Sequence, residues 1–513
     1  MKHTGVFAGS YIDMNSKLKL KVLDIFGWLC IGLILVTLAD VVGNEYFDVN
    51  DKKFIFALGF IAMWRYTNAL IHFCRGMYFL YYKFPKVRKA VDEIGADAMP
   101  PEMFIVVTSF RIPSDTTFKV YQSVFKECNN LDMPVTVVVS IVEKGDERLI
   151  KETMKKTVED SERVKLVIIR ARGTGKRDGL GHAFRAVSRC EPQEGSVVGV
   201  VDGDTLLVPG CVEKAVSVFS VFPSVGGVTT DEYCTVRGSF FSQQWHAMRF
   251  VQRHINMCSM SLSKRVLTMT GRLSFFRANL LTSKEFINDV SSDYLDHWRL
   301  GRFKFLTGDD KSSWFSLMKS GWDTYYVPDS KTLTVEDPPS ESFFKSTVVL
   351  MFRWYGNSLR QNFRAFKYLG RKRLGNFASY VLLDQRVSMW TSLLGLSVTL
   401  VASLVYDIKY LFVYVFWVLL TRSIVALSFL SSGHYVGSMY PLALYYNQIV
   451  GSVVKVYALF HLDKQSWTRQ KTVLAKSSDK IDCFMNIISS KAMLISSISI
   501  FFSLVGLIIS YTD

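Results

Sequence analysis

Long apolar segments near both ends of the chain set the strongest limit on its fold. One runs from residue 25 to 42 (IFGWLCIGLILVTLADVV), and a second, less uniform run covers 54–71. Further runs lie at 388–406, 410–430 and about 492–510. Each is long enough to cross roughly 30 Å of hydrocarbon as an α-helix, which rises about 1.5 Å per residue. The sequence therefore predicts a multi-pass membrane protein.

The segment between these groups of apolar runs has the pattern of an α/β domain. Apolar stretches that read as buried strands alternate with amphipathic helical patterns at 116–129 and 146–158. The predicted strands are FIVVTSF (104–110), VTVVVSIV (135–142), VKLVIIRA (164–171) and SVVGVVDGD (196–204). Buried strands that alternate with helices indicate a mostly parallel sheet.

Composition supports a soluble domain embedded among spans. A mean hydropathy of +0.18 is too high for a soluble enzyme of 513 residues, whereas 21% charged residues are too many for a chain that lies wholly in the membrane. The net charge of +16 favours an anionic membrane face or an anionic substrate. We expect no nucleic-acid partner, because no zinc finger or aromatic–basic RNA signature is present. The eight cysteines include no CxxC pair, which favours reduced thiols in a cytoplasmic domain over disulfides or structural zinc.

Four parts of the chain follow from these patterns. We predict an N-terminal membrane region with two spans (1–84), the α/β domain (85–340), basic amphipathic helices on the membrane face (341–387) and a C-terminal membrane region (388–513). The Lys and Arg clusters can all be cytoplasmic only if 440–460 is re-entrant or interfacial. Five spans with an external C-terminus are therefore favoured, and six are the alternative. The first 20 residues show no evident cleaved signal peptide.

Polar side chains interrupt the second apolar run and its continuation. Arg65, Asn68, His72 and Arg75 lie along one predicted helix. Charges inside a span usually face a protein interior or a wet path. The other interpretation is that His72 and Arg75 reach the membrane interface.

The segment VVGVVDGDTLL (197–207) is the most informative about chemistry. Its apolar strand ends in Asp202-Gly203-Asp204, which places two carboxylates at the edge of the sheet where ligands of α/β proteins bind. Mg²⁺ in proteins is commonly held by one or two carboxylates together with substrate phosphates. Asp202 and Asp204 are therefore predicted to bind Mg²⁺ or Mn²⁺ with a nucleotide diphosphate. A lone Asp-x-Asp pair also occurs by chance in loops. The buried strand that precedes this pair is what favours metal binding over a chance match.

A second acidic pair, Asp309 and Asp310, opens a predicted helix in LTGDDKSSWF. A carboxylate at that position can act as a general base, and transfer of a sugar with inversion needs one to take the proton of the acceptor hydroxyl. The other interpretation is that Asp309 caps the helix, as Asp commonly does. Both roles can be filled, because two aspartates are present.

Two basic segments complete the set of motifs. In RARGTGKRDGLGHAFR (170–185), glycines permit close approach of the backbone, and Lys176 and Arg177 can reach phosphates; a flexible basic loop is the alternative. Arg353 and Trp354 lie on the basic amphipathic segment, where an indole can stack on a sugar ring or anchor the chain at the interface.

In their order along the chain, these segments resemble the family-2 glycosyltransferases, such as cellulose, chitin and hyaluronan synthases. The order is a strand, the basic glycine loop, DGD, TGRLSFFR (270–277), GDDK, RW and then the spans. The resemblance covers nearly the whole chain. It implies an α/β, GT-A-like cytoplasmic domain flanked by transmembrane and interfacial helices. It also implies that Asp202 and Asp204 bind metal and diphosphate, and that Asp310, with Asp309 beside it, is the general base.

Other motifs of this family are matched less fully. Its QxxRW motif carries over to Arg353 and Trp354, but Leu350 stands at the glutamine position, which leaves contacts with the acceptor end in doubt. Glu143 and Asp146 are the candidates for its early nucleotide-binding carboxylate. A gating-loop motif is matched within QSWTRQ by Trp467, Thr468 and Arg469.

The chain is similar to the branch of the family that polymerises alginate. Four stretches carry this similarity: 261–280, 296–318, 351–362 and 384–396. That similarity implies GDP-mannuronate as donor and β-1,4-linked polymannuronate as product, threaded through the protein's own spans. It also implies a bacterial inner-membrane location and a partner subunit with a cyclic-di-GMP-binding PilZ domain, since this chain shows no such motif of its own.

A uronate donor brings a carboxylate in addition to its diphosphate. Arg272 is our preferred partner for that carboxylate and Lys311 the second choice, because a buried carboxylate needs a cation. Gly271 and His297 lie in or near the same motifs and complete the predicted sugar-binding set.

Two other functions remain open at this point. A UDP-sugar donor would make the chain a hyaluronan- or chitin-like synthase with the same chemistry. A transporter whose soluble domain only regulates gating belongs to a different class, and it predicts transport that survives loss of Asp310.

Overall fold

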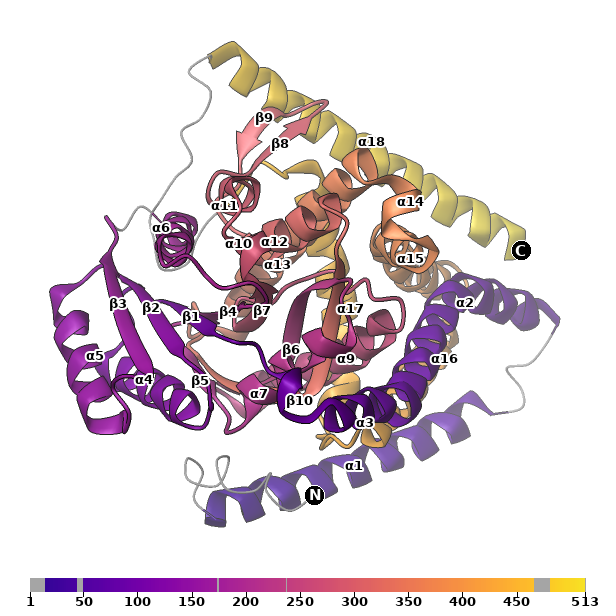
Figure 1. Ribbon diagram of the computed structural model, residues 1–513. Coiled ribbons are helices and arrows are strands. Elements are labelled where there is room, and N and C mark those ends of the chain that lie inside the picture. Colours follow the sequence, from indigo (N-terminus) through magenta and orange to yellow (C-terminus); the bar gives the residue numbers. More distant parts are fainter. Residues whose placement is uncertain (1–13, 44–48, 173–174, 237, 466–479, 513) are drawn as a thin grey trace.

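The computed structural model describes residues 14–43, 49–172, 175–236, 238–465 and 480–512, and shows a central mixed sheet surrounded by helices (Figure 1). The sheet has eight strands in the order β3-β2-β1-β4-β7-β6-β10-β5. These strands are β1 (Met103–Thr108), β2 (Val135–Ile141), β3 (Val164–Arg170), β4 (Val197–Asp202), β5 (Thr205–Leu207), β6 (Val225–Val236), β7 (Leu273–Arg277) and β10 (Asp323–Glu336). The α/β class and the predominance of parallel pairing are confirmed.

The four strands predicted from apolar stretches form one parallel half of the sheet. β3, β2, β1 and β4 pair in parallel, and β6 pairs in parallel with β10. β7 is antiparallel to both β4 and β6, and so joins the two parallel parts. β1 and β2 are almost wholly buried because helices cover both faces of the sheet, which explains why their sequences do not alternate.

Within its described residues, the α/β domain contains ten α-helices. They are α3 (Phe84–Ile94), α4 (Ser114–Asn129), α5 (Lys144–Thr157), α6 (Lys176–Arg189), α7 (Cys211–Val216), α8 (Val218–Val221), α9 (Phe240–Ser261), α10 (Ala278–Leu281), α11 (Lys284–Ser291) and α12 (Asp309–Lys319). A small hairpin, β8 (Tyr294–His297) and β9 (Gly301–Lys304), stands apart from the main sheet. α4 and α5 were predicted almost to the residue.

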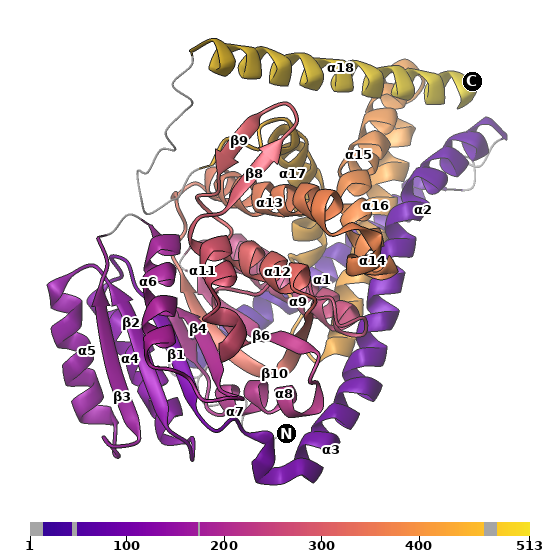
Figure 2. The same ribbon diagram turned by 45° about the horizontal axis from the view of Figure 1, so that its top comes forward.

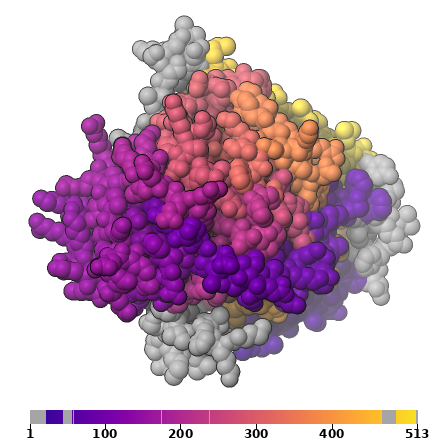
Figure 3. Space-filling view, in the orientation of Figure 1, coloured from indigo at the N-terminus to yellow at the C-terminus, as the bar shows by residue number. Residues whose placement is uncertain are grey.

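The remaining helices belong to the two ends of the chain. They are α1 (Met14–Val42), α2 (Val49–Tyr78), α13 (Phe343–Tyr368), α14 (Gly370–Leu374), α15 (Asn376–Val405), α16 (Lys409–Ser428), α17 (Tyr440–Phe460) and α18 (Lys480–Thr512). Figure 2 shows α2 along one side of the molecule and α18 along its top, away from the outer strands β2 and β3. In Figure 3 the α/β domain fills the left and centre of the face, and the indigo surface of α2 and α3 borders it.

Four helices in the described part of the chain are long and apolar enough to cross a membrane. They cover Val22–Val42, Asn376–Val405, Lys409–Ser432 and Phe484–Ser510, which match four of the five predicted spans. The fifth predicted span, 54–71, lies within α2 and stays a prediction, because the search for spans covered only the described residues. Residues 440–460 form one unbroken helix, α17, rather than a re-entrant hairpin, since Pro441 falls in the first turn, where it is tolerated.

One boundary of the predicted organisation falls inside a helix. α15 begins at Asn376 and continues through residues 387 and 388, where we had separated interfacial helices from spans. The break occurs instead at Gly375, whose φ of 78° is in the left-handed region that favours glycine.

A buried apolar cluster joins the α/β domain to the membrane helices. Trp245 and Met248 of α9 pack with Met351 of α13 and with Ala443 and Leu444 of α17. At about 25 cal/mol for each Å² of apolar surface removed from water, such contacts fix these helices against one another. The site described next lies where α9 and α13 meet the sheet.

Candidate active site

The DGD segment lies at the carboxyl end of β4, as the sequence predicts. Asp202 is the last residue of β4, and the N–H of Gly203 donates to the carbonyl of Thr108 at 2.9 Å. A Cβ at position 203 would lie 2.4 Å from Ser109 Oγ and 2.8 Å from that carbonyl. Only glycine therefore lets the chain turn between the two aspartates, which fixes Asp202 at the edge of the sheet.

A partly buried lysine links two of the predicted carboxylates. Lys176 Nζ, at the start of α6, lies 2.6 Å from Asp202 Oδ1 and 2.8 Å from Asp309 Oδ2. Burial alone would lower the pKa of Lys176, but the two carboxylates raise it above its ordinary value. Gly271 makes room for this contact, because a Cβ there would lie 2.8 Å from the ammonium nitrogen. The structure thus brings together Lys176, Asp202, Gly271 and Asp309 from four separate segments.

The pKa values of the two aspartates in this cluster shift in opposite directions. Burial raises the pKa of Asp202 to about 6, and the charges of Asp204 and Asp309 add to that effect despite the neighbouring ammonium of Lys176. For Asp309, burial alone would also raise the pKa, but Lys176 and Arg177 hold it below the ordinary range. As the pH falls, Asp309 therefore keeps its charge longer than Asp202 does.

Asp309 and Asp310 open α12 as predicted, and the structure separates their surroundings. Both aspartates line the cavity, but Asp309 is buried against Lys176, whereas Asp310 is only partly buried. The hydroxyl of Thr268 donates to Asp310 Oδ2 at 2.9 Å. A general base must reach the substrate and be held in one orientation, and Asp310 meets both requirements.

Arg177 faces away from the cavity. Its guanidinium donates to the carbonyls of Val290 (2.7 Å) and Thr307 (2.9 Å) and to Ser312 Oγ (3.0 Å). These bonds hold the loop before α12 and place Asp309. Protein acceptors occupy both Nη groups of Arg177, which does not line the cavity, so its predicted contact with phosphate stays a prediction.

The site suits a hard divalent cation. Asp202 and Asp204 supply the carboxylate oxygens that Mg²⁺ and Mn²⁺ prefer, and both line the cavity. The Lys176 ammonium bound to Asp202 shows that the position already attracts positive charge. Asp202 and Asp204 are the residues that would hold the metal together with diphosphate oxygens.

Arg272 forms an ion-pair network with protein carboxylates. Its guanidinium contacts Glu232 of β6 and Glu336 of β10, and Arg253 Nη1 of α9 lies 2.7 Å from Glu232 Oε1. Thr270 Oγ1 also donates to Glu232, at 3.3 Å. Burial alone would lower the pKa of Arg272, but Glu232 and Glu336 raise it. Arg272 lines the cavity, yet its charge is already matched within the protein, which argues against it as the partner of a donor carboxylate.

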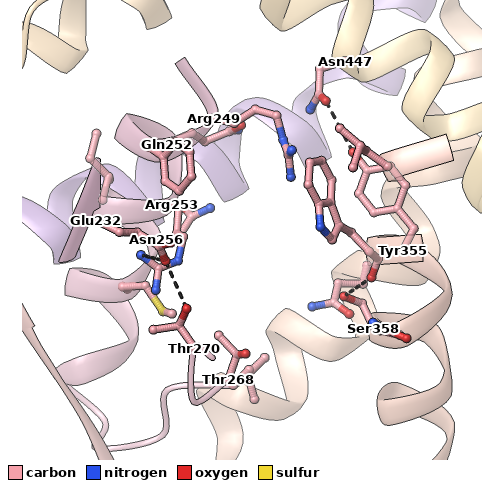
Figure 4. Close-up of a pocket in the computed structure, with 18 of the residues that line it drawn as sticks. Glu232, Arg249, Gln252, Arg253, Asn256, Thr268, Thr270, Tyr355, Ser358 and Asn447 are labelled. Carbon is pink, nitrogen blue, oxygen red and sulfur yellow. Dashed lines mark hydrogen bonds and ion pairs between the residues drawn. The ribbon is translucent and has the colours of Figure 1, made fainter. Parts of the chain in front are cut away.

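Arg249 of α9 has different surroundings from Arg272. Its guanidinium carbon lies 3.7 Å from the ring centroid of Trp354 and 4.8 Å from that of Trp245. Its contacts in the described part of the chain are with these indoles rather than with a carboxylate. Figure 4 shows Arg249 reaching into the cavity from α9, opposite Tyr355 of α13. Burial lowers its pKa, as expected for a charge that lacks full compensation.

The other predicted residues divide between the cavity and more distant positions. Arg353, Trp354 and Lys311 line the cavity, and Lys311 Nζ donates to the carbonyl of Leu267 at 3.3 Å. His297 does not line it; its Nδ1 accepts from the N–H groups of Arg299 and Leu300, both at 3.2 Å.

The remaining residues predicted to contact the nucleotide lie either away from this cavity or outside the described part of the chain. Glu143, just before α5, lies 3.7 Å from Arg111, and neither it nor Asp146 lines the cavity. Trp467, Thr468 and Arg469 lie outside the described residues.

The cavity has a volume of about 1210 Å³ and reaches well beyond the aspartates. One end is lined by Asp202, Asp204 and Asp310, and the other by polar residues of membrane-region helices. These are Arg65, Asn68 and His72 of α2, Asp384 and Ser388 of α15, and Asn447, Gln448, Ser452 and Lys455 of α17. The polar side chains of α2 thus face a protein interior, and Arg75 donates to Ser259 and Ser263 instead of reaching the interface.

Sequence reasoning missed one wall of this cavity. Figure 4 shows Arg249, Gln252, Arg253 and Asn256 side by side along α9. Their spacing of three and four residues places them on one face of a helix, a signal present in RFVQRHIN. Glu232 was also missed, because a buried carboxylate within a strand resembles a loop residue in sequence.

Comparisons with known proteins agree with this architecture. Residues 100–357 match the family described as "Glycosyltransferase like family 2". The chain is 52% identical to "Glycosyltransferase alg8" of Pseudomonas syringae pv. tomato, over 94% of this chain and 98% of that protein. It is 53% identical to "Glycosyltransferase alg8" of Azotobacter vinelandii, over 94% and 97% of the two chains. A mannosyltransferase from Pyrobaculum calidifontis, solved with GDP-Man and Mn²⁺, aligns with a TM-score of 0.47 and 16% identity, over 78% of this chain and 97% of that one.

Proposed function

Because this chain belongs to glycosyltransferase family 2 and is a glycosyltransferase, we propose that it polymerises a uronic acid processively and threads the product across a bacterial inner membrane. The donor we propose is GDP-mannuronate and the product β-1,4-linked polymannuronate. The catalytic domain faces the cytoplasm, where nucleotide sugars are made.

One observation carries this proposal: a single cavity joins the carboxylates of the α/β domain to polar side chains of the membrane-region helices. An enzyme that releases a short product into water has no need for such a continuation. A polymer that grows at Asp310 has a polar route from there past α9 and α13 toward α2, α15 and α17.

In the proposed reaction, Asp310 is the catalytic base. Its carboxylate takes the proton of the acceptor hydroxyl as that oxygen attacks the anomeric carbon and the bond to the diphosphate breaks, so that configuration inverts. Thr268 orients the carboxylate through its hydrogen bond. Mg²⁺ or Mn²⁺ held by Asp202 and Asp204 would neutralise charge on the leaving diphosphate. Lys176 keeps Asp202 and Asp309 in place.

Recognition of the sugar carboxylate is the step that separates a uronate polymerase from its neutral-sugar relatives. We assign this role to Arg249, because its guanidinium enters the cavity and stacks on indoles, and within the described residues no ion pair with a carboxylate is formed, although nearby Glu336 favours its charge. Trp354, against which Arg249 stacks, offers a face for a sugar ring. This assignment replaces Arg272, which Glu232 and Glu336 already neutralise.

The proposed partners are the donor, the growing polysaccharide, inner-membrane lipids and a PilZ-domain subunit that binds cyclic-di-GMP. No nucleic acid is among them. The test is polymer formation by membranes that contain the protein, supplied with GDP-mannuronate or with UDP-sugars, with and without cyclic-di-GMP. Polymer from GDP-mannuronate alone supports the proposal. Polymer only from a UDP-sugar would instead make the chain a hyaluronan- or chitin-like synthase.

A further inference from the structure

A cluster of potential metal ligands lies behind the wall of the cavity and takes no part in the proposed reaction. It consists of Asp231 on β6, His254 on α9 and His434 in the segment between η4 (Phe429–Ser432) and α17. One ligand atom from each residue lies within 4.8 Å of the others. Asp231 and His254 are buried, and His434 is partly buried.

The Asp231 carboxylate is held in place but incompletely satisfied. The hydroxyl of Tyr326, on β10, donates to Asp231 Oδ1 at 2.6 Å. Asp231 Oδ2 has no hydrogen-bond partner among the described residues, although Asp231 is only 1% exposed. It lies 3.2 Å from His254 Nδ1, which is 2.8 Å from the Tyr326 hydroxyl. This buried oxygen therefore faces His254, with which it forms an ion pair when the imidazole is protonated, and it belongs to the same close group of ligand atoms as His434.

The histidines are arranged for coordination. The ring centroids of His254 and His434 are 4.6 Å apart. His434 Nδ1 lies 3.1 Å from the carbonyl of Ser432. Because a carbonyl only accepts, this contact places the proton on Nδ1 and leaves the Nε2 lone pair of His434 for a metal. Metal-bound histidines commonly donate their other N–H to such a carbonyl.

The distances match zinc coordination for two of the three ligands. With bonds of about 2.0–2.1 Å, tetrahedral zinc ligands stand roughly 3.3 Å apart, which is close to the separation of Asp231 Oδ2 and His254 Nδ1. The third ligand, on a segment outside helix and strand, closes the set by a small inward movement. Water completes four-coordination, and His254 gives up its Nδ1 proton on binding.

We propose that Asp231, His254 and His434 bind Zn²⁺ at a site distinct from the catalytic carboxylates. The ligands join the sheet and α9 to the segment that connects two membrane-region helices, α16 and α17. The metal therefore clamps the catalytic domain to the membrane region.

The site is also coupled to the cavity through adjacent residues. Glu232 follows Asp231 on β6 and pairs with Arg253, which precedes His254 on α9. Because neighbouring residues of a strand point to opposite faces, the zinc ligands and this ion pair occupy opposite sides of one wall. Zinc binding fixes the spacing of β6 and α9, and with it the Glu232–Arg253 pair.

The test uses the full-length protein, purified in detergent and stripped with a chelator. It is dialysed against limiting Zn²⁺ and then assayed for bound metal by mass spectrometry and for affinity by competition with a chromophoric chelator. We expect one equivalent of zinc in the wild type and in Asp202→Asn/Asp204→Asn, and none in His434→Ala. Tyr326→Phe should weaken zinc binding by roughly 10- to 100-fold, as loss of an orienting partner does elsewhere.

Two further variants control for misfolding of His434→Ala and for the loss of a histidine elsewhere in the chain. His434→Cys keeps a zinc ligand, so it should retain the metal even if His434→Ala is poorly folded. His182→Ala is the matched control, because His182 lies on α6 beside Asp178 as an exposed pair outside the cluster. Zinc should raise the melting temperature of the wild type and of His182→Ala but not of His434→Ala. A wild type without zinc, equal binding by His434→Ala, or loss of zinc in Asp202→Asn/Asp204→Asn would overturn the proposal.

Discussion

Arg272 and Arg249 line the same cavity, and the structure predicts opposite consequences for their removal. Arg272→Ala takes the cation from Glu336 and leaves Glu232 with Arg253. The side chains of Arg272, Glu232 and Glu336 are 21%, 1% and 16% exposed, so solvent compensates little. Breaking a buried ion pair by removing one partner costs about 3–5 kcal/mol of folding free energy.

Arg249→Ala removes a different kind of contact. A guanidinium stacked on an indole contributes about 0.5–2 kcal/mol, so its loss should affect stability much less. For a domain of 150–250 residues, roughly 2–4 °C of melting temperature correspond to each kcal/mol. The Arg272 variant should therefore melt roughly 6–20 °C below the wild type, and the Arg249 variant no more than about 8 °C below it.

Donor recognition should show the reverse pattern. A hydrogen bond to a charged group contributes about 1.5–3 kcal/mol, so loss of the Arg249–carboxylate contact should weaken GDP-mannuronate binding roughly 10- to 100-fold. Binding of GDP alone should be unchanged, since the nucleotide lacks that carboxylate. The assays are thermal unfolding followed by tryptophan fluorescence, and displacement of a labelled GDP by GDP or GDP-mannuronate. A selective loss of GDP-mannuronate binding in Arg272→Ala, with normal melting, would refute this division of roles.

Three further predictions concern the carboxylates and one buried histidine. Asp310→Asn should leave donor binding nearly intact and lower turnover by about 10²–10⁴-fold, measured as GDP release; if Asp309→Asn lowers turnover more, the two roles are reversed. Asp204→Asn should abolish turnover in a folded, inserted protein, and EDTA should do the same until Mg²⁺ or Mn²⁺ is restored, whereas full activity in EDTA would exclude the metal. Burial lowers the pKa of His246 from 6.5 to about 4, so the unfolded chain binds more protons between these values and stability should rise with pH across that window. His246→Gln should flatten this rise in melting curves, and an unchanged slope would contradict the assignment.

The parts of the fold that follow local rules were predictable from sequence. β1, β2, β3 and β4 appear as apolar stretches because helices cover both faces of the sheet there. The strand β6 was not predicted, since buried Thr229, Thr230, Asp231 and Glu232 interrupt its apolar pattern. Such residues are tolerated only because partners from distant segments neutralise or hydrogen-bond them, and single-sequence patterns do not contain those partners.

In the site, too, sequence predicted which kinds of residue are present but not which of them contact one another. The DGD and GDD motifs could be recognised from sequence because each adjoins a predictable element. DGD follows an apolar strand, and the two aspartates of GDD begin a helix. That Lys176 bridges Asp202 and Asp309, or that Glu232 and Glu336 neutralise Arg272, depends on contacts between residues far apart in the chain. Sequence therefore identified cationic residue types that a uronate donor would need, but not that Arg272 pairs with two protein carboxylates.

The cavity shows which environment the polar side chains of α2 face, a question that their sequence pattern leaves open. In sequence, Arg65 and His72 fit a wet path or a protein interior, and His72 fits the membrane interface equally well. In the structure both line the cavity that begins at the catalytic carboxylates, and Lys455 of α17 lines it as well. Cations along such a route offset the desolvation of a polymer that carries one carboxylate per sugar. If the proposed route is used, a polyuronate would pass Arg65 and Lys455 beside the single carboxylate of Asp384 in its membrane part, cations for which a neutral glycan has no need.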